Sequence, residues 1–394
     1  MRACIAIPSL STHGGAERVV CEQIQYLSSE GWGVTLLVAD YDQAILDDYG
    51  VPHSVNIVVT SGGLIDDTLT VRKILNEEDI DIILTHSFTK RVYLATRPFG
   101  DDTPYIPHVH GTVLWFVDEP NRLPHANSRS YQELISSVPG HGEFYDELSP
   151  SSQNTLHSYV NEWLEKRALQ SSSTVITGSH QVQRELETLY TVDSLIARPG
   201  VSKAWISQYE ETEHLSLTNH DYTILSVSRL DKRKRVSLLI KAVGSLRQDG
   251  YDVGLVVAGT GERREHLENL SEKLGIRDSV IFAGFVPETE LPSYYKSADV
   301  FACPGWMSYG ITPLEAYAMR TPVGVSSDAF VNEVLTGKPG VEVVQPNIDE
   351  WVEMIPKLLK IDPTSIDPSI VPTWEQYGLE LHKIINRLVV DKSR

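Results

Sequence analysis

A dense run of cationic side chains is the first feature of this sequence that could do chemistry. The segment 228–235 reads Ser-Arg-Leu-Asp-Lys-Arg-Lys-Arg and follows the apolar run 223–227. The chain as a whole has 53 acidic and 34 basic residues, so such cationic density favours an anionic ligand. Arginine and lysine suit the oxygens of a diphosphate. A solvated charged turn is the structural alternative.

A helix start at 309–316 is a second candidate for an anion site. The segment reads Tyr-Gly-Ile-Thr-Pro-Leu-Glu-Ala. We predict Thr312 as the N-cap, Pro313 at the first helical position and Glu315 completing a capping box. The exposed amides of this helix start could bind a phosphate, although capping alone also explains the spacing.

Two glycine-rich turns share the same setting, directly after a predicted strand and before a predicted helix. Gly14 and Gly15 follow the first apolar run, and Gly259 and Gly261 follow the run 254–258. Glycine lets the backbone approach a ligand closely, and the positive end of the following helix would face that ligand. Tight turns without a ligand remain the alternative, and the second turn lacks the spacing of a dinucleotide fingerprint.

His108 and His110 close another predicted strand, 105–109. Alternation along a strand places both imidazoles on one face. A His-x-His pair can bind metal, but the sequence shows no matching set of histidines and carboxylates, so we predict no metal site.

These residues lie at the ends of short apolar runs that alternate with amphipathic segments, which is typical of parallel sheets crossed by helices. The first helix is expected at 15–30, with Gly31 as its stop. The predicted strands are 4–8, 34–39, 55–59, 80–84, 105–109, 174–177, 195–197, 223–227, 254–258, 280–283, 300–303, 323–326 and 341–344.

Breaks in the alternation of predicted strands and helices divide the chain into domains. We expect a Rossmann-like domain at 1–200 with an insertion at about 114–156, a linker at 201–221 and a second Rossmann-like domain at 222–372. The insertion could be a lid or a surface excursion. A last helix within 373–394 has apolar residues at helical spacing and is expected to pack, with the first domain as one possible partner.

Composition excludes several classes of function. A formal charge of -19 argues against nucleic-acid binding and against purely electrostatic attachment to an anionic membrane. Cys4, Cys21 and Cys303 are too scattered for a zinc or redox motif, and no run approaches a membrane span. We expect a cytoplasmic protein, with peripheral contact at the inner membrane face as an open alternative.

Taken in order, these motifs resemble those of the retaining GT-B glycosyltransferases of family 4, over nearly the whole chain outside the insertion. Such enzymes have a Gly-Gly turn after strand one, an Arg-Leu followed by Lys, a Gly-x-Gly turn and a glutamate-containing phosphate loop. In this chain those positions are Gly14 and Gly15, Arg229 and Lys234, Gly259 and Gly261, and Gly310 with Glu315.

The resemblance implies two Rossmann-like domains with parallel sheets facing an interdomain cleft, and a role for each matched residue. Arg229 and Lys234 would neutralise the donor diphosphate, the amides near Gly310, Ile311 and Thr312 would bind its oxygens, and Glu315 would hold the ribose. His110 would lie near the sugar, and the segment 282–286, with Phe285 and Val286, near the base.

Two positions depart from the family pattern. Met307 stands where the family usually has a glutamate that contacts the donor sugar, and Arg235 stands where a glycine usually follows the lysine. The first departure keeps a catalytically silent sugar-nucleotide-binding protein open as an alternative, beside a GT-B epimerase and a metal hydrolase built on His108 and His110.

By this resemblance the protein is expected to transfer a sugar from a nucleotide-diphosphate sugar to a glycan or lipid-linked acceptor, with retention of configuration. Its place would be in polysaccharide or glycoconjugate biosynthesis, as a hexosyltransferase-type enzyme. The donor is a co-substrate, and no cofactor is expected. The nucleotide, the sugar and the acceptor are read by pocket shape, so the sequence does not identify them.

Overall fold

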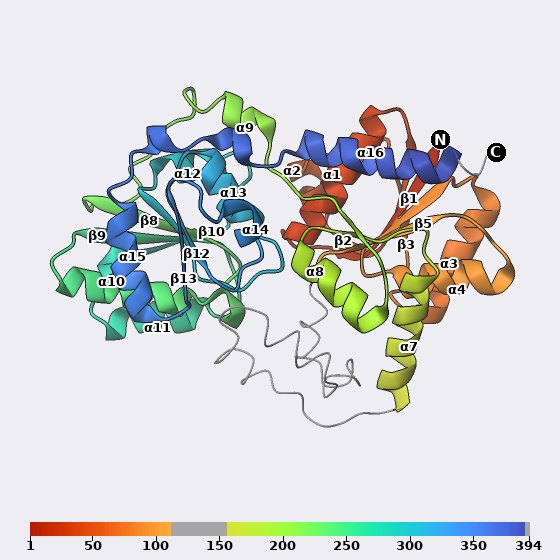
Figure 1. The fold of residues 1–394 in the computed structure, drawn as a ribbon, viewed down its shortest axis with the longest axis horizontal. Helices are drawn as coiled ribbons and strands as arrows, with labels where there is room; N and C mark the ends of the chain where they lie inside the picture. Colours follow the sequence, from red (N-terminus) through yellow and green to blue (C-terminus); the bar gives the residue numbers. More distant parts are fainter. Residues whose placement is uncertain (112–155, 391–394) are drawn as a thin grey trace. The chain divides into compact units, whose positions relative to one another are not determined.

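A computed structural model describes residues 1–111 and 156–390, and these residues form two compact units (Figure 1). Of the described residues, the first unit contains 1–199 and 374–390, and the second contains 200–373. The insertion expected at 114–156 therefore lies almost entirely outside the described residues. None of the helices in the described part of the chain has the length and apolar character needed to cross a membrane.

The first unit is built on a seven-stranded parallel sheet with the order β3-β2-β1-β4-β5-β6-β7. The chain runs outward from β1 to β3 and then returns to place β4 on the other side of β1. In a parallel sheet, ligands bind beyond the carboxyl ends of the strands at such a reversal. In this unit the reversal lies between β1 and β4.

The strands of the first unit are β1 (Arg2–Leu10), β2 (Gly33–Tyr41), β3 (Asn56–Val59), β4 (Ile82–Thr85), β5 (Tyr105–Val109), β6 (Ile176–Thr177) and β7 (Leu195–Ile196). Its helices are α1 (Gly15–Ser29), α2 (Gln43–Asp48), α3 (Leu64–Glu77), α4 (Thr89–Thr96), α7 (Leu156–Gln170), α8 (His180–Glu185) and α16 (Trp374–Val390).

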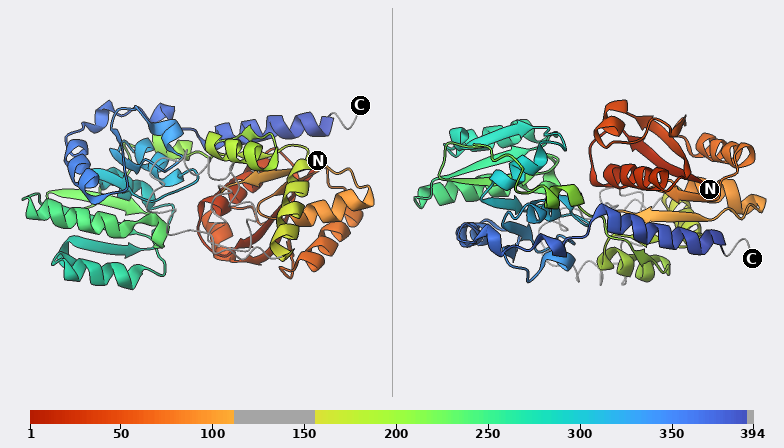
Figure 2. Two further views of the ribbon diagram at one scale, coloured as in Figure 1. Left: turned by 60° about the horizontal axis from the view of Figure 1, so that its bottom comes forward. Right: turned by 90° about the horizontal axis from the view of Figure 1, so that it is seen from above.

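The C-terminal helix α16 packs on α1 within the first unit, although the two helices are far apart in sequence (Figures 1 and 2). The contact is close because Gly378 has no side chain, and a Cβ there would lie 2.1 Å from the ring of Tyr26. Tyr377, the residue before Gly378, is buried and hydrogen-bonds to Gln23 of α1.

The second unit is built on a six-stranded parallel sheet with the order β10-β9-β8-β11-β12-β13. Its reversal lies between β8 and β11. Successive residues of each strand enter opposite cores, because side chains alternate across a sheet. Ile224 packs with α10, α11 and α15 on one face, and Leu225 packs with α12, α13 and α14 on the other.

The strands of the second unit are β8 (Tyr222–Val227), β9 (Val253–Ala258), β10 (Val280–Gly284), β11 (Val300–Cys303), β12 (Val323–Ser326) and β13 (Val341–Val344). Its helices are α9 (Lys203–Ser207), α10 (Val236–Gln248), α11 (Arg264–Lys273), α12 (Leu291–Ser297), α13 (Ile311–Ala318), α14 (Asn332–Leu335) and α15 (Ile348–Leu358).

The predicted α/β class with parallel sheets is confirmed. Each predicted strand overlaps an observed one, and β5, β11, β12 and β13 have the predicted bounds. The first helix also ends as expected, because Gly31 adopts a φ of 79°, a left-handed conformation that stops a helix.

Candidate functional site

Three turns meet at the carboxyl end of the second sheet, and backbone hydrogen bonds join them. Leu230 in the turn after β8 donates its N–H to the Thr260 carbonyl at 2.8 Å, and Gly259 after β9 donates to Gly284 at 2.6 Å. Trp306 in the turn after β11 donates to the Arg233 carbonyl at 3.1 Å. The cationic segment therefore lies at the reversal of the sheet, where an α/β fold binds ligands.

The glycines after β9 are required by this close packing. Gly259 has a φ of 133°, and a Cβ there would lie 1.9 Å from the Ser228 carbonyl oxygen. Gly261 has a φ of 158°, and its Cβ would lie 2.6 Å from the Leu230 carbonyl oxygen. The two glycines thus let the turn after β9 lie directly against the start of the cationic segment.

The cations of this segment have different environments. Arg229 is exposed and lies 3.9 Å from Asp231. Lys234 is partly buried, and its backbone and side chain run past Gly305, whose Cβ would lie 2.9 Å from the Lys234 Cα. Burial lowers the pKa of the Lys234 amine, and Cys303 and Asp231 oppose that shift. An anion bound beside Lys234 would stabilise the charged amine.

Two buried polar atoms beside the cations have no hydrogen-bond partner among the described residues. They are the Ser228 hydroxyl oxygen and Oδ1 of Asp231. Buried polar groups are normally satisfied, and one left unpaired costs about 1–3 kcal/mol. Their position at the mouth of the sheet indicates a place where a polar ligand completes the hydrogen bonding.

Arg235 stabilises the conformation of the loop. Its guanidinium makes two hydrogen bonds to the fully buried carboxylate of Asp328, at 3.1 and 2.7 Å, and a third to the Pro304 carbonyl at 3.1 Å. The side chain thereby ties the end of the cationic segment to the segments that follow β11 and β12.

The predicted N-cap of α13 is wrong. The helix begins at Ile311 with Gly310 as its N-cap, and Thr312 lies inside the first turn. Gly310 takes this place because its φ is 108°, a conformation that disfavours other residues. A Cβ on Gly310 would also lie 2.1 Å from the sulfur of Met307. The predicted capping box is therefore absent, and the helix starts one residue after a glycine turn.

Met307 and Glu315 lie in the core on either side of this helix start. Met307 is 6% exposed, and its sulfur lies 4.0 Å from the Cys303 sulfur. Glu315 is 7% exposed, and its Oε2 accepts a hydrogen bond of 2.8 Å from the Tyr295 hydroxyl. Burial first, and then the Glu315 charge, raise the pKa of Tyr295, so the phenol keeps its proton and remains a donor.

The segment 282–286, assigned to the nucleotide base, covers the end of β10 and the two residues after it. Phe285 is 46% exposed, whereas Val286 is buried in the core of the second unit. The hydrogen bond from Gly259 to Gly284 joins this segment to the glycine turn.

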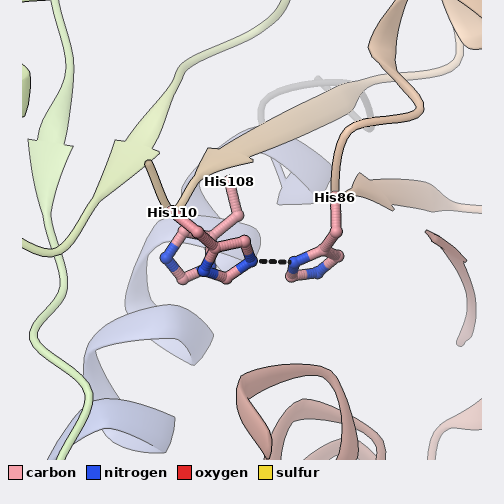
Figure 3. Close-up of side chains that lie close together, drawn as sticks. All are labelled: His86, His108 and His110. Carbon is pink, nitrogen blue, oxygen red and sulfur yellow. Dashed lines mark hydrogen bonds between the residues drawn. The ribbon is translucent and has the colours of Figure 1, made fainter. Parts of the chain in front are cut away.

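In the first unit, His86, His108 and His110 lie side by side at the carboxyl ends of β4 and β5 (Figure 3). His86 Nδ1 and His110 Nε2 are 2.6 Å apart and hydrogen-bonded. The rings of His108 and His110 are stacked with centroids 4.2 Å apart, as the predicted alternation along β5 requires. His86 and His108 are almost fully buried, and His110 is partly buried.

Burial makes these imidazoles weak bases. It lowers the pKa of His110 to about 4, and together with the neighbouring imidazoles it lowers the pKa of His86 and of His108 well below the usual range. All three rings are therefore neutral near pH 7, each with one proton and one lone pair.

A neutral imidazole is the form that binds metal, and the nitrogens of the trio lie within 4.8 Å of one another. The ring planes do not suit a shared ion, because His86 and His110 are 18° from parallel and His108 and His110 are 25° from parallel. Lone pairs lie in the ring planes, so nearly parallel rings do not point at one atom. The direct hydrogen bond between His86 and His110 fits this geometry.

The first glycine turn lies between β1 and α1. Gly14 is the N-cap of α1 in an extended conformation, and Gly15 is the first helical residue. A Cβ on Gly14 would lie 2.3 Å from a carboxylate oxygen of Glu17. The glycine therefore makes room for a side chain of the first helical turn.

His86, Gln23 and Tyr377 were not among the predicted site residues. His86 follows β4 without any local motif, and it reaches the His-x-His pair because β4 and β5 are neighbours in the sheet. The signal in the sequence was weak: a lone histidine directly after an apolar run. Gln23 and Tyr377 carried no signal, because their helices meet only in the folded chain.

Solved structures establish the class of protein to which this architecture belongs. The chain matches a sucrose-phosphate synthase from Thermosynechococcus elongatus with a TM-score of 0.73 and 15% identity, over 99% of both chains. It matches WaaG, a glycosyltransferase involved in lipopolysaccharide biosynthesis, with a TM-score of 0.67 and 16% identity, over 98% of this chain and 99% of that one. The fold is the GT-B fold.

Two family models match consecutive parts of the chain. The model described as Glycosyltransferase Family 4 matches residues 13–201, and the model described as Glycosyl transferases group 1 matches residues 208–368. The protein belongs to the GT-B glycosyltransferases of family 4, also called glycosyl transferases group 1, as its motifs predicted.

Curated relatives match over shorter stretches. An uncharacterized glycosyltransferase of Methanocaldococcus jannaschii is 35% identical over 34% of this chain. An alpha-monoglucosyldiacylglycerol synthase of Streptococcus pneumoniae is 33% identical over 32%. A GDP-mannose-dependent alpha-(1-6)-phosphatidylinositol monomannoside mannosyltransferase of Mycolicibacterium smegmatis is 33% identical over 34%. The matches span 35%, 28% and 38% of these relatives, respectively.

Proposed function

We propose that this protein transfers a sugar from a nucleotide-diphosphate sugar to an acceptor, with retention of configuration, and that the second unit binds the donor diphosphate. The observation that carries the proposal is the cationic segment at the reversal of the second sheet. There Arg229 and Lys234 stand beside the buried Ser228 hydroxyl, which has no partner among the described residues and can donate to a phosphate oxygen.

A diphosphate fits this arrangement better than a neutral ligand does. Its oxygens would accept charge-assisted hydrogen bonds from the guanidinium of Arg229 and the amine of Lys234, and a neutral hydrogen bond from the Ser228 hydroxyl. The backbone amides at the start of α13 add further donors, because the first amides of a helix lack intrahelical partners. Lys234 gains most, because a nearby anion offsets the desolvation of its amine.

The same groups can stabilise the leaving diphosphate as the glycosidic bond breaks. Positive charge that is already in place acts without reorganisation, which makes it effective in the transition state. We place His110 near the sugar and Glu315 near the ribose. In the proposed reaction the departing phosphate takes the proton of the acceptor hydroxyl, so no carboxylate nucleophile is needed.

We assign the acceptor to the first unit and propose that it is lipid-linked or a glycan. The names of two relatives support a lipid acceptor, since one is a monoglucosyldiacylglycerol synthase and another acts on a phosphatidylinositol monomannoside. Such an acceptor is compatible with peripheral contact of the protein with the inner face of a membrane.

Donor binding is tested first, without any acceptor. UDP, GDP, UDP-glucose and GDP-mannose are titrated against the protein while its unfolding temperature is recorded, because a ligand that binds only the folded state raises this temperature. We expect one nucleotide class to stabilise the wild type. Arg229→Ala and Lys234→Ala should lose that stabilisation and lower sugar transfer at least about 100-fold, the range of a lost charge-stabilising group.

Lys241→Ala is the matched control, because Lys241 is an exposed lysine of α10 in the same unit. This variant should bind and transfer as the wild type does. Full activity in Arg229→Ala and Lys234→Ala would refute the proposal that these two residues form the diphosphate site.

The alternatives give different results in the same experiments. Met307, an apolar side chain where the family usually has a carboxylate, favours a silent binding protein, which would be stabilised by a nucleotide sugar yet release none of its sugar. An epimerase would convert one sugar nucleotide into another without an acceptor. A metal hydrolase would contain stoichiometric metal after purification.

A further inference from the structure

The backbone of the first unit is strained at one exposed residue of its ligand-binding edge. Among the described residues, those other than glycine with a positive φ are Ser87 at 57°, Thr191 at 55°, Arg235 at 49° and Arg320 at 56°. This left-handed conformation is unfavourable for any residue with a Cβ atom, so it persists only where the surrounding structure imposes it.

Three of these conformations have a structural cause nearby. The side chain of Arg235 is held by its ion pair with Asp328. Thr191 and Arg320 each follow a helical segment, where a left-handed residue commonly ends the helix. Ser87 differs from them, because it precedes α4 and its side chain makes no hydrogen bond within the described part of the chain.

The turn 86–88, which connects β4 to α4, is held at both ends. His86 is 1% exposed, and its N–H donates to the Ala6 carbonyl at 2.8 Å. Phe88 is fully buried. The buried hydroxyls of Thr85 and Thr89 are hydrogen-bonded across the turn at 2.9 Å. These contacts impose the left-handed conformation on the residue between them, and that residue is exposed to solvent.

The strained residue also lies where a parallel sheet takes its ligand. The turn follows the carboxyl end of β4, at the reversal between β1 and β4. The two cations in the first turn of α4 are already paired, Lys90 with Glu165 at 3.2 Å and Arg91 with Asp67 at 2.7 Å. The exposed hydroxyl of Ser87 can both donate and accept a hydrogen bond. These surroundings therefore suit an uncharged ligand with hydroxyl groups better than an anion.

We infer that Ser87 is a specificity-determining residue of the acceptor site, where its hydroxyl hydrogen-bonds to a hydroxyl group of a carbohydrate acceptor. A glycine would fit this backbone without strain, so the presence of a serine indicates that the side chain is used. The inference deepens the proposed function and rests on the assignment of the acceptor to the first unit.

The strain is tested by calorimetry, with two substitutions of Ser87. Ser87→Ala removes the hydroxyl and keeps the Cβ, whereas Ser87→Gly removes both. We expect the first unit of Ser87→Gly to unfold about 2–4 °C above that of Ser87→Ala. Thr191→Gly is the matched control, because Thr191 is an exposed left-handed residue of the same unit, and its midpoint should rise as well. A Ser87→Gly variant that is no more stable than Ser87→Ala overturns the inference.

The hydroxyl is tested by sugar transfer to two soluble probes, octyl β-D-glucopyranoside and octyl α-D-mannopyranoside. The donor is UDP-glucose or GDP-mannose, whichever stabilises the wild type. In both Ser87 variants kcat/KM for the glycoside should fall about fivefold, mainly through a higher KM, since one neutral hydrogen bond is lost. Stabilisation by the donor should be unchanged, and Thr191→Gly should transfer as the wild type does.

A merely structural role would give a different pattern, because stability and transfer would then fall together. We expect Ser87→Gly to be more stable than Ser87→Ala and equally impaired toward the glycoside. Transfer at the wild-type rate in Ser87→Ala overturns the inference, and so does a wild type that binds its donor but transfers to neither glycoside.

These results distinguish the inference from the proposed function. If no nucleotide sugar stabilises the wild type or is turned over by it, the proposed function fails and the inference fails with it. If the donor is bound and its sugar is transferred, but the Ser87 variants match the wild type, only the inference fails.

Discussion

The pair of Arg235 and Asp328 offers a quantitative test of how the cationic segment is held in place. Asp328 is fully buried, and the Arg235 guanidinium contacts both of its carboxylate oxygens. Removing one partner of such a pair leaves a buried charge without compensation, which costs about 3–5 kcal/mol. Arg235→Ala should therefore destabilise the second unit by that amount.

Backbone strain distinguishes two substitutions at the same position. Arg235 has a φ of 49° and a ψ of 30°, a left-handed conformation that costs a non-glycine residue about 1 kcal/mol. Arg235→Gly loses the same ion pair but removes this strain, so it should be about 1 kcal/mol less destabilising than Arg235→Ala. This order is specific to the observed backbone geometry.

Calorimetry is the suitable assay, because two compact units can unfold in separate transitions. For a unit of this size about 1 kcal/mol shifts the midpoint by about 2–4 °C, so Arg235→Ala should lower one transition by about 6–20 °C. Adding Asp328→Asn to Arg235→Ala should recover at least about 1 kcal/mol, since the buried charge is then gone. The reasoning would be refuted if Arg235→Ala lowered the free energy of unfolding by less than about 1 kcal/mol. It would also be refuted if the double variant lost the sum of the free energies that the two single variants lose.

Three further predictions follow from burial and backbone geometry. Burial lowers the pKa of His110 in the folded protein to about 4, whereas the ordinary value in an unfolded chain is about 6.5. Between these two pH values the unfolded state binds a proton that the folded state does not, so the free energy of unfolding decreases from pH 6.5 toward pH 4, by up to about 3 kcal/mol. Urea unfolding at pH 7 and pH 5 should show a smaller loss in His110→Asn, and equal losses would contradict this. Gly259→Ala should abolish nucleotide stabilisation, because its Cβ meets the Ser228 carbonyl, whereas Gly250→Ala, where nothing lies within 4 Å, should retain it. Finally, a thiol reagent at pH 8 should leave the native protein unmodified and should label three thiols after unfolding. The reason is that burial raises the thiol pKa to about 12 for Cys4, about 12 for Cys21 and about 11 for Cys303. Labelling of the native protein would contradict this prediction, because it would show that these thiols are accessible.

The strands and the main helices could be predicted because local patterns specify them. Short runs rich in apolar β-forming residues, such as 300–303 and 341–344, are bounded by turn residues and agree with β11 and β13. The start of α13 could not be predicted as well, because two local signals compete. Thr312 has the side chain of an N-cap, but the left-handed backbone at Gly310 decides where the helix begins.

The histidine trio shows a different limit. His108 and His110 are two residues apart at the end of β5, so alternation along the strand predicted their contact. His86 is 24 residues away from His110, and only the order of strands in the sheet brings His86 Nδ1 to 2.6 Å from His110 Nε2. Gln23 and Tyr377 are 354 residues apart, and their contact follows from the packing of α16 on α1.

The two sheet reversals carry different chemistry, and the difference bears on which ligand group each unit can hold. The second unit presents arginine and lysine together with the Ser228 hydroxyl, which has no partner among the described residues, and these groups can stabilise negative charge. The first unit presents buried imidazoles whose pKa values are lowered, and it would destabilise a charge placed among them while accepting hydrogen bonds from hydroxyls. A phosphate is therefore expected at the second reversal and an uncharged sugar hydroxyl at the first, because exchanging the two would bury an anion without a cation.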